Sequence, residues 1–157
     1  MRESYQYTET RNFKFKELKV YSSTEWLAEN KKKYRQVFNR FDISYIYAEF
    51  SFFNKRFDEE DWEIELDLKC YALRKGKKEL CLLPIKKRVS KFEPIVYIRE
   101  GWGNKTEGAF WKKGTYYWEA SVKGEKIASK YFYVEESGHA PDNREKPFME
   151  LDSVSLY

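Results

Sequence analysis

Histidine and cysteine are nearly absent from this sequence, whose 157 residues include one histidine and two cysteines. A structural zinc site requires about four Cys or His ligands, and a disulfide scaffold requires several cysteine pairs. A Ser-His-Asp or Cys-His site requires an imidazole beside its nucleophile, whereas His139 lies in a polar stretch that is typical of a linker. We therefore expect a protein that is not an enzyme and that holds no metal and no cofactor.

Long apolar runs and a strong excess of one charge are absent as well. No run approaches the roughly 18 apolar residues of a membrane-spanning helix, and the first residues lead into polar sequence rather than into a signal peptide. The 30 basic and 26 acidic residues are interspersed and leave a net charge of +4. These features favour a soluble, cytoplasmic protein that does not bind a membrane, and they disfavour nucleic acid as a partner.

Aromatic residues are what the sequence has in excess: 12 Phe, 13 Tyr and 5 Trp. A core is available if these rings are buried, and the length suits one domain with tails. Apolar and polar residues alternate with a period of two in a series of short segments, which predicts strands. The segments are 13–21, 44–52, 64–70, 79–83, 85–90, 95–99, 115–123 and 126–135.

The first of these strands slips in phase at Lys16-Glu17, and the last is out of phase at Ile127, where we expect a bulge. About seven short strands separated by turns predict a β-sandwich.

One helix is expected after the first strand. Ser22 and Glu25 have the spacing of a capping box, with Ser22 as the N-cap. Tyr21 and Trp26 would form the hydrophobic staple around that cap. Together these signals predict an α-helix over about 24–38.

A hairpin is expected between the strands 64–70 and 79–83. If its loop has two residues, Cys70 faces Cys81 across the hairpin. We interpret the two cysteines as small core residues, and a redox pair is the alternative.

A second local motif points to an immunoglobulin-like sandwich. The segment from Gly114 to Trp118 has the Gly-x-Tyr-x-Φ form of a tyrosine corner, in which the hydroxyl of Tyr116 would bond to upstream backbone. Trp118 stands where antibody domains have a cysteine. The predicted fold is therefore an all-β, immunoglobulin-like antiparallel β-sandwich of about seven strands with one α-helix inserted after the first.

The domain is expected to span residues 13–135. Residues 1–12 are predicted to form a disordered tail and 136–147 a linker. The apolar pattern of the first strand recurs near the C-terminus, so 148–157 would be a C-terminal strand or the start of a following domain.

Two tryptophans are the main candidates for binding a partner. Trp102 and Trp111 lie in predicted turns, where a large ring has no strand face to fill. An exposed tryptophan in a loop is suited to anchor a protein partner or to stack on a sugar, whereas a ring that folds back into the core is the alternative. The polar rim of this contact would comprise Asn104, Asp58, Glu59 and Asp61.

Clusters of lysine and arginine leave a third possibility, weak binding to nucleic acid. Such binding would require several clusters on one face, with aromatic rings for stacking. The clusters lie at 31–33, 75–78, 86–91 and 112–113.

Three segments carry a resemblance to a known family: YSSTEWLA with KKKYR (21–35), YIYAEFSF with FDEEDW (45–62), and VYIREGWG (96–103). Together they resemble the non-catalytic N-terminal region of bacterial AAA+ ATPases that are similar to a sporulation-stage chaperone, over roughly residues 13–135. The resemblance implies that an ATPase module follows Tyr157 and that this region captures a partner or substrate for it. It implies no catalytic residue here, because the segment from Gly103 to Thr106 lacks the Gly-x-x-x-x-Gly-Lys loop that cradles phosphate.

Overall fold

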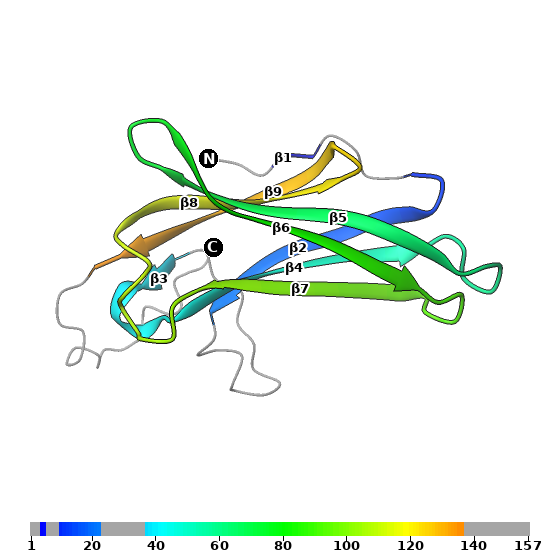
Figure 1. The fold of residues 1–157 in the computed structure, drawn as a ribbon, viewed down its shortest axis with the longest axis horizontal. Coiled ribbons are helices and arrows are strands. Elements are labelled where there is room, and N and C mark those ends of the chain that lie inside the picture. Colours follow the sequence, from blue (N-terminus) through cyan, green and yellow to red (C-terminus); the bar gives the residue numbers. More distant parts are fainter. Residues whose placement is uncertain (1–3, 6–9, 23–36, 137–157) are drawn as a thin grey trace.

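The computed structural model describes residues 4–5, 10–22 and 37–136, which form two packed β-sheets (Figure 1). The first sheet has the order β1-β9-β8-β5-β6, with β3 parallel to β9, and the second has the order β2-β4-β7. Nine strands lie in this part of the chain, two more than expected: β1 (Ser4–Tyr5), β2 (Phe13–Ser22), β3 (Val37–Asn39), β4 (Tyr45–Asn54), β5 (Trp62–Leu73), β6 (Lys77–Val89), β7 (Ile95–Gly103), β8 (Gly114–Val122) and β9 (Glu125–Glu135).

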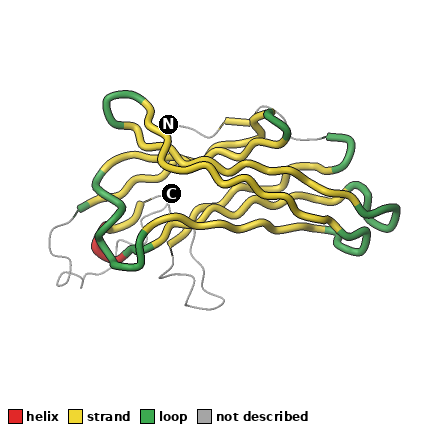
Figure 2. Tube along the Cα trace, in the orientation of Figure 1, coloured by secondary structure: helices red, strands yellow, loops and turns green. Residues whose placement is uncertain are grey.

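The prediction of an immunoglobulin-like β-sandwich is confirmed. In the letters used for immunoglobulin domains, β2, β4 and β7 take the places of strands A, B and E, and β5, β6, β8 and β9 those of C, C′, F and G. The sheets pack face to face, as Figure 2 shows for the strands in yellow. Apart from the parallel pair β3–β9, the strand pairs are antiparallel.

Aromatic rings fill the space between the sheets, as the composition led us to expect. Alternate residues of each strand point inward, because successive side chains of a strand lie on opposite faces. Fully buried rings from four strands meet there: Phe13, Phe50, Phe52, Trp118 and Phe132.

The predicted bulge at Ile127 is present, and a bulge also accounts for the phase slip at Lys16. The pairing of β2 with β4 shifts between Phe15 and Glu17, which leaves Lys16 as the extra residue. The pairing of β8 with β9 shifts between Ala120 and Ser121, which leaves Ile127 unpaired but fully buried.

Cys70 and Cys81 face each other across β5 and β6, but not because the turn has two residues. Leu73 pairs with Lys77, so three residues form the turn, and a register shift beyond Cys70 restores the cysteine pairing. Both thiols are free and buried, as expected of core residues.

Two of the predicted strand ends are wrong. The segments 79–83 and 85–90 form one strand, β6, which runs through Pro84. Proline has no N–H to donate and is tolerated at a sheet edge, which is where β6 lies. Similarly, β7 continues through Gly101 and Trp102 to Gly103, because these residues pair with β4.

The predicted helix over about 24–38 falls mostly outside the described residues, as does Glu25 of the capping box. Its last two residues are not helical, since Val37 and Phe38 belong to β3. Ser22, the expected N-cap, is the buried last residue of β2. The one described helix is a short 3-10 turn, η1 (Arg40–Asp42).

The chain ends differ in part from the predictions. Within the stretch expected to be a disordered tail, β1 pairs with β9 and the hydroxyl of Thr10 accepts hydrogen bonds from two backbone N–H groups. The predicted linker over 136–147, apart from its first residue, and the predicted C-terminal strand over 148–157 lie outside the described residues.

The tyrosine corner is confirmed, and it holds the loop that precedes β8. The hydroxyl of Tyr116 donates to the carbonyl oxygen of Lys112 over 2.6 Å and accepts from the Lys112 N–H over 3.2 Å. The ring of Tyr116 stacks on Phe132 with centroids 5.3 Å apart. The corner therefore ties the loop to both β8 and β9.

We predict that Tyr116→Phe lowers the free energy of unfolding by about 0.5–1.5 kcal/mol, because the partly buried backbone groups of Lys112 lose their hydrogen-bond partner. Denaturation with urea measures this change. Tyr97→Phe is the matched control, since that hydroxyl is on an exposed side chain and its loss is expected to cost less than about 0.5 kcal/mol. Equal effects of the two substitutions would show that the corner does not stabilise the fold.

Candidate interaction site

Trp111, predicted as an exposed anchor, is completely buried, so that prediction is wrong. Its ring meets Tyr116 and Phe132 edge to face, with centroids 5.0 and 5.6 Å apart. Its indole N–H donates to the carbonyl oxygen of Trp102 over 3.2 Å. The hydrogen bonds between the Tyr116 hydroxyl and the Lys112 backbone hold the neighbouring Trp111 in the core. This ring therefore cannot serve as a stacking platform for a sugar.

Trp102 and Asn104 have structural partners as well. Trp102 of β7 lies opposite Ile46 of β4 and is partly buried against the core. Asn104 is exposed, and its side-chain oxygen accepts a hydrogen bond from the Thr106 N–H over 2.8 Å, which stabilises the turn after β7. Gly103 is required there, because a Cβ would lie 2.0 Å from the carbonyl oxygen of Ser44.

The acidic residues expected in the rim lie at the other end of the sandwich. Asn104 follows Gly103, which pairs with Tyr45 at the start of β4, whereas residues 58–61 follow the end of β4 at Asn54. A ten-residue strand such as β4 spans about 30 Å. The structure therefore does not bring Asp58, Glu59 and Asp61 together with Trp102 and Asn104.

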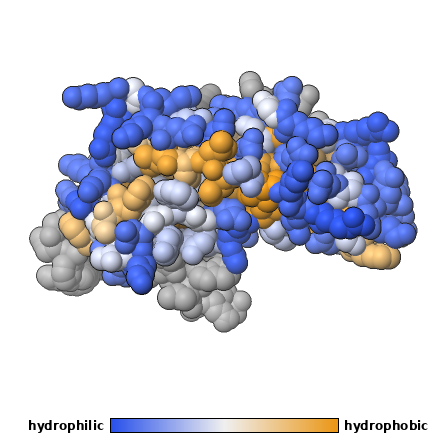
Figure 3. Space-filling view, viewed as in Figure 1, coloured by the Kyte–Doolittle hydropathy of each residue, from blue (hydrophilic) through white to orange (hydrophobic). Residues whose placement is uncertain are grey.

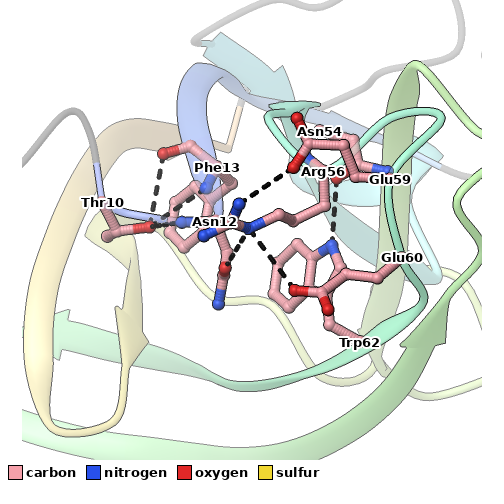
Figure 4. A network of polar contacts seen from close by, with 8 residues as sticks. All are labelled: Thr10, Asn12, Phe13, Asn54, Arg56, Glu59, Glu60 and Trp62. Carbon is pink, nitrogen blue, oxygen red and sulfur yellow. Dashed lines mark hydrogen bonds and ion pairs between the residues drawn. The ribbon is translucent and has the colours of Figure 1, made fainter.

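A polar network holds the acidic loop in place (Figure 4). The side chain of Asn54 accepts from the Trp62 indole N–H over 3.0 Å and donates to the carbonyl oxygens of Ser90 and Glu93. It thereby connects β4, the start of β5 and the turn between β6 and β7.

Arg56 forms the other half of this network (Figure 4). Its guanidinium donates to Asn12 over 3.0 Å and pairs with Glu59 and Glu60. The carboxylate of Asp61 accepts from the Lys91 N–H and pairs with Arg88, and these partners lower its pKa. Glu59 and Asp61 are thus engaged within the domain.

Exposed aromatic rings surround this network. Most large apolar side chains of the domain are buried, but Phe53, Phe57, Phe92 and Tyr97 are 39, 47, 71 and 53% exposed. We call these four residues the aromatic cluster. Exposed aromatic residues in a polar setting mark protein-binding surfaces.

Backbone contacts place the cluster at one end of the molecule. Phe53 lies opposite Ile95 in the pairing of β4 with β7, and Tyr97 lies two residues further along β7. Phe57 and Phe92 lie in the turns after β4 and β6, and these turns are joined by a hydrogen bond from the Asp58 N–H to the carbonyl oxygen of Lys91. Figure 3 shows a pale orange tip at the turn between β6 and β7, at the right of the view.

A groove of about 400 Å³ opens at the same end. Its floor is apolar, with Phe13 and Trp62 stacked in parallel and 6.3 Å apart. Charged residues of both signs border it: Arg11, Glu63, Glu65, Lys123 and Glu125. The aromatic cluster and this groove together form the candidate interaction site.

The sequence contained a signal for this site that the prediction missed. Phe57 directly precedes the acidic residues that were expected to form a polar rim, and Phe92 stands between the predicted strands 85–90 and 95–99. A phenylalanine in such a loop has no strand face to fill, which was the argument applied to the two tryptophans.

The two cysteines are poorly suited to chemistry. Burial raises the pKa of Cys81 from 9.0 to about 11, and burial together with the neighbouring Cys81 raises the pKa of Cys70 well above its ordinary value. Both side chains are therefore protonated at neutral pH, and the thiolate is the reactive form.

The described residues form no metal site, and two of the basic clusters lie far apart. Over residues 4–5, 10–22 and 37–136, no group of three His, Cys, Asp or Glu side chains is placed to hold a metal ion. No helix in this part of the chain has the length and apolar character needed to cross a membrane. The lysines at 75–78 and at 86–91 lie towards opposite ends of β6.

Comparison with known proteins yields similarity of fold only. No protein-family model matches the chain, and no curated protein matches it. Among solved structures, the alkylpurine DNA glycosylase AlkC of Pseudomonas fluorescens, bound to DNA with an abasic site analog, is 14% identical with a TM-score of 0.48. The match covers 79% of this chain and only 30% of the glycosylase.

Two further structures match over nearly their whole length. A Niemann-Pick type C2 protein from the Japanese carpenter ant is 15% identical, with a TM-score of 0.44 and coverage of 84% of this chain and 99% of that one. An immunoglobulin-like protein from Pseudomonas aeruginosa is 10% identical, with a TM-score of 0.44 and coverage of 86% and 98%. Likeness at this level carries no argument about function.

We predict that Trp111→Ala lowers the free energy of unfolding by about 3–5 kcal/mol, because it leaves a cavity among aromatic rings. Thermal and urea denaturation measure the loss. Phe92→Ala, at an exposed ring, is the control and is expected to change stability by less than about 0.5 kcal/mol. A fully stable Trp111→Ala variant would contradict the burial of this ring.

Proposed function

We propose that this domain is a non-catalytic protein-interaction module that recruits a partner or substrate protein to an attached AAA+ ATPase. The observation that carries the proposal is the aromatic cluster of Phe53, Phe57, Phe92 and Tyr97, exposed at one end of an otherwise well-buried sandwich. The attached ATPase rests on the resemblance of the three sequence segments described above.

Aromatic rings left at the surface lower the stability of the free domain. Complete burial of a large apolar side chain contributes about 1.5–3 kcal/mol, and the four partly exposed rings forgo a part of this stabilisation. Buried aromatic residues contribute much of the binding energy of protein interfaces. A partner that covers the cluster would recover that stabilisation.

The surrounding groups favour a protein over a polyanion. Arg56 and Arg88 are already paired with carboxylates of the acidic loop. A mixture of rings and paired charges is typical of protein interfaces, in which a polar rim surrounds an apolar centre. The hydrogen bonds of Asn54 hold both turns in position, so few side chains would lose freedom on binding.

We predict that Phe57→Ala with Phe92→Ala abolishes capture of the partner without lowering stability. The measurement is affinity capture from the source cells with quantitative mass spectrometry, followed by calorimetric titration of the captured protein. Phe41→Ala, at a similarly exposed phenylalanine towards the other end of the domain, is the matched control and should leave capture unchanged. Equal capture by the double variant and the wild type would refute the role of the aromatic cluster.

The association with an ATPase has its own test, which is to determine the coding sequence beyond codon 157. We expect a P-loop of the form Gly-x-x-x-x-Gly-Lys-Ser/Thr downstream. A stop codon at that point would remove the ATPase from the proposal and leave the interaction module.

A further inference from the structure

The two sheets leave the sandwich open along one side. β6 is the edge strand of the first sheet and β7 that of the second, and neither has a second strand partner within the described part of the chain. Figure 1 shows the two strands meeting at the turn of residues 90–94 and diverging toward the other end. We call the wedge between them the seam.

Apolar side chains line the seam. Leu80, Leu83 and Ile85 of β6 and Trp102 of β7 are only partly buried, and all four pack against the core. Figure 3 shows the result as an orange band in the middle of the surface, along β6. Among the described residues, no strand covers this apolar area on the side of the second sheet that ends at β7.

One more strand beside β7 would cover this area. It would extend the second sheet, and its alternate side chains would face Leu83 and Ile85 across the seam. β7 is the better edge for pairing, because its nine residues include no proline, whereas Pro84 deprives β6 of one N–H group.

Charge indicates what kind of strand fits. Five exposed lysines lie at the wide end of the seam, where Leu73 pairs with both Lys77 and Thr115: Lys75, Lys77, Lys78, Lys112 and Lys113. Within the described residues, none of the five forms an ion pair, although the ammonium of Lys77 lies over the ring of Tyr71, 4.7 Å from its centroid. They would attract acidic residues at one end of an incoming strand.

A second charge restricts where those acidic residues can lie. Glu100 occupies an inward position in the middle of β7, opposite Ala48, yet is exposed. It would repel a carboxylate at the centre of the added strand. Acidic residues are therefore favoured at the end of the strand and disfavoured in its middle.

We propose that the seam binds an extended peptide segment of another protein, which adds as a strand to β7. The segment has alternating apolar residues that cover Leu83, Ile85 and Trp102, and acidic residues at the end that reaches the lysines. Of the aromatic cluster only Tyr97 lies on β7, on the face of that strand opposite to Val96 and Ile98, and no residue of the cluster is among those that line the seam, so either site can fail without the other.

The test uses three fluorescein-labelled synthetic peptides of about ten residues, the length of a long strand. The first has three glutamates followed by alternating valine and threonine; the second has three lysines in their place; the third is the first with proline for its central valine. Fluorescence anisotropy at low salt should show binding of the glutamate peptide, with the other two at least about tenfold weaker. Binding should slow amide hydrogen exchange in β7.

Two variants of neighbouring residues separate the seam from the outer face of the sheet. Leu83→Asp, on the inward side of β6, should weaken binding of the glutamate peptide at least about tenfold. Leu82→Asp is the matched control, because Leu82 points outward and should leave binding unchanged. Circular dichroism verifies that both variants are folded.

A third variant keeps the test decisive if Leu83→Asp does not fold. Lys77→Glu with Lys78→Glu changes only exposed side chains and, with Lys75, Lys112 and Lys113 still present, should weaken the preference for the glutamate peptide over the lysine peptide. Equal binding of the two peptides to the wild type, protection outside β7, or loss of peptide binding in the Phe57→Ala, Phe92→Ala variant would overturn the proposal. Absence of binding, or a dimer of the chain that excludes the peptide, would overturn it as well.

Discussion

The burial of Trp111 beneath the hydroxyl of Tyr116 is the contact on which one end of this sandwich depends. Tyr116, whose hydroxyl holds the backbone of Lys112, belongs to β8 of the first sheet. The indole N–H of Trp111 donates to the carbonyl oxygen of Trp102 in β7 of the second sheet. A single ring therefore links the two sheets and fixes the loop between β7 and β8. The same contact removes from the surface the residue that looked most suited to bind a partner.

The opposite end is held by a different kind of interaction, and this difference decides what is exposed there. Asn54 and Arg56 hold the neighbouring segments through hydrogen bonds and ion pairs, and the indole N–H of Trp62 is one of the donors (Figure 4). The carboxylates of Glu59 and Asp61 are engaged in holding the turns. Phe57 and Phe92 are left at the surface, and for this reason we propose the rings, rather than the acids, as the contact with a partner.

Basic and acidic residues are nearly equal in number, but they are unevenly distributed over the surface. The lysines near Leu73 gather at one end because strand pairing brings two turns together, while the acidic loop follows β4 at the other end. The seam between β6 and β7 connects these regions along an apolar path. The proposed peptide site depends on that arrangement, which net charge does not reveal.

The sequence by itself determined the strands other than β1 and β3, and the side of each that faces the core, because a period of two specifies which residues share a face. It also determined the bulge at Ile127 and the tyrosine corner, since each depends on spacing within one strand or between neighbours. Cys70 faces Cys81 as predicted, but through a three-residue turn and a register shift that the spacing did not predict. Strand ends were less well predicted: Pro84 and Gly101 read as breaks, although an edge strand tolerates both.

Only the tertiary structure decided which rings are exposed and which loops lie together. The loop of residues 104–113 has no periodicity, so nothing local indicated that Trp111 turns inward while Phe92 remains outside. Asp61 and Asn104 are far apart because they follow opposite ends of β4 in space. The seam is open because β6 ends the first sheet and β7 ends the second, with no described strand beside either. These are contacts between residues far apart in the chain, and local sequence patterns carry no record of them.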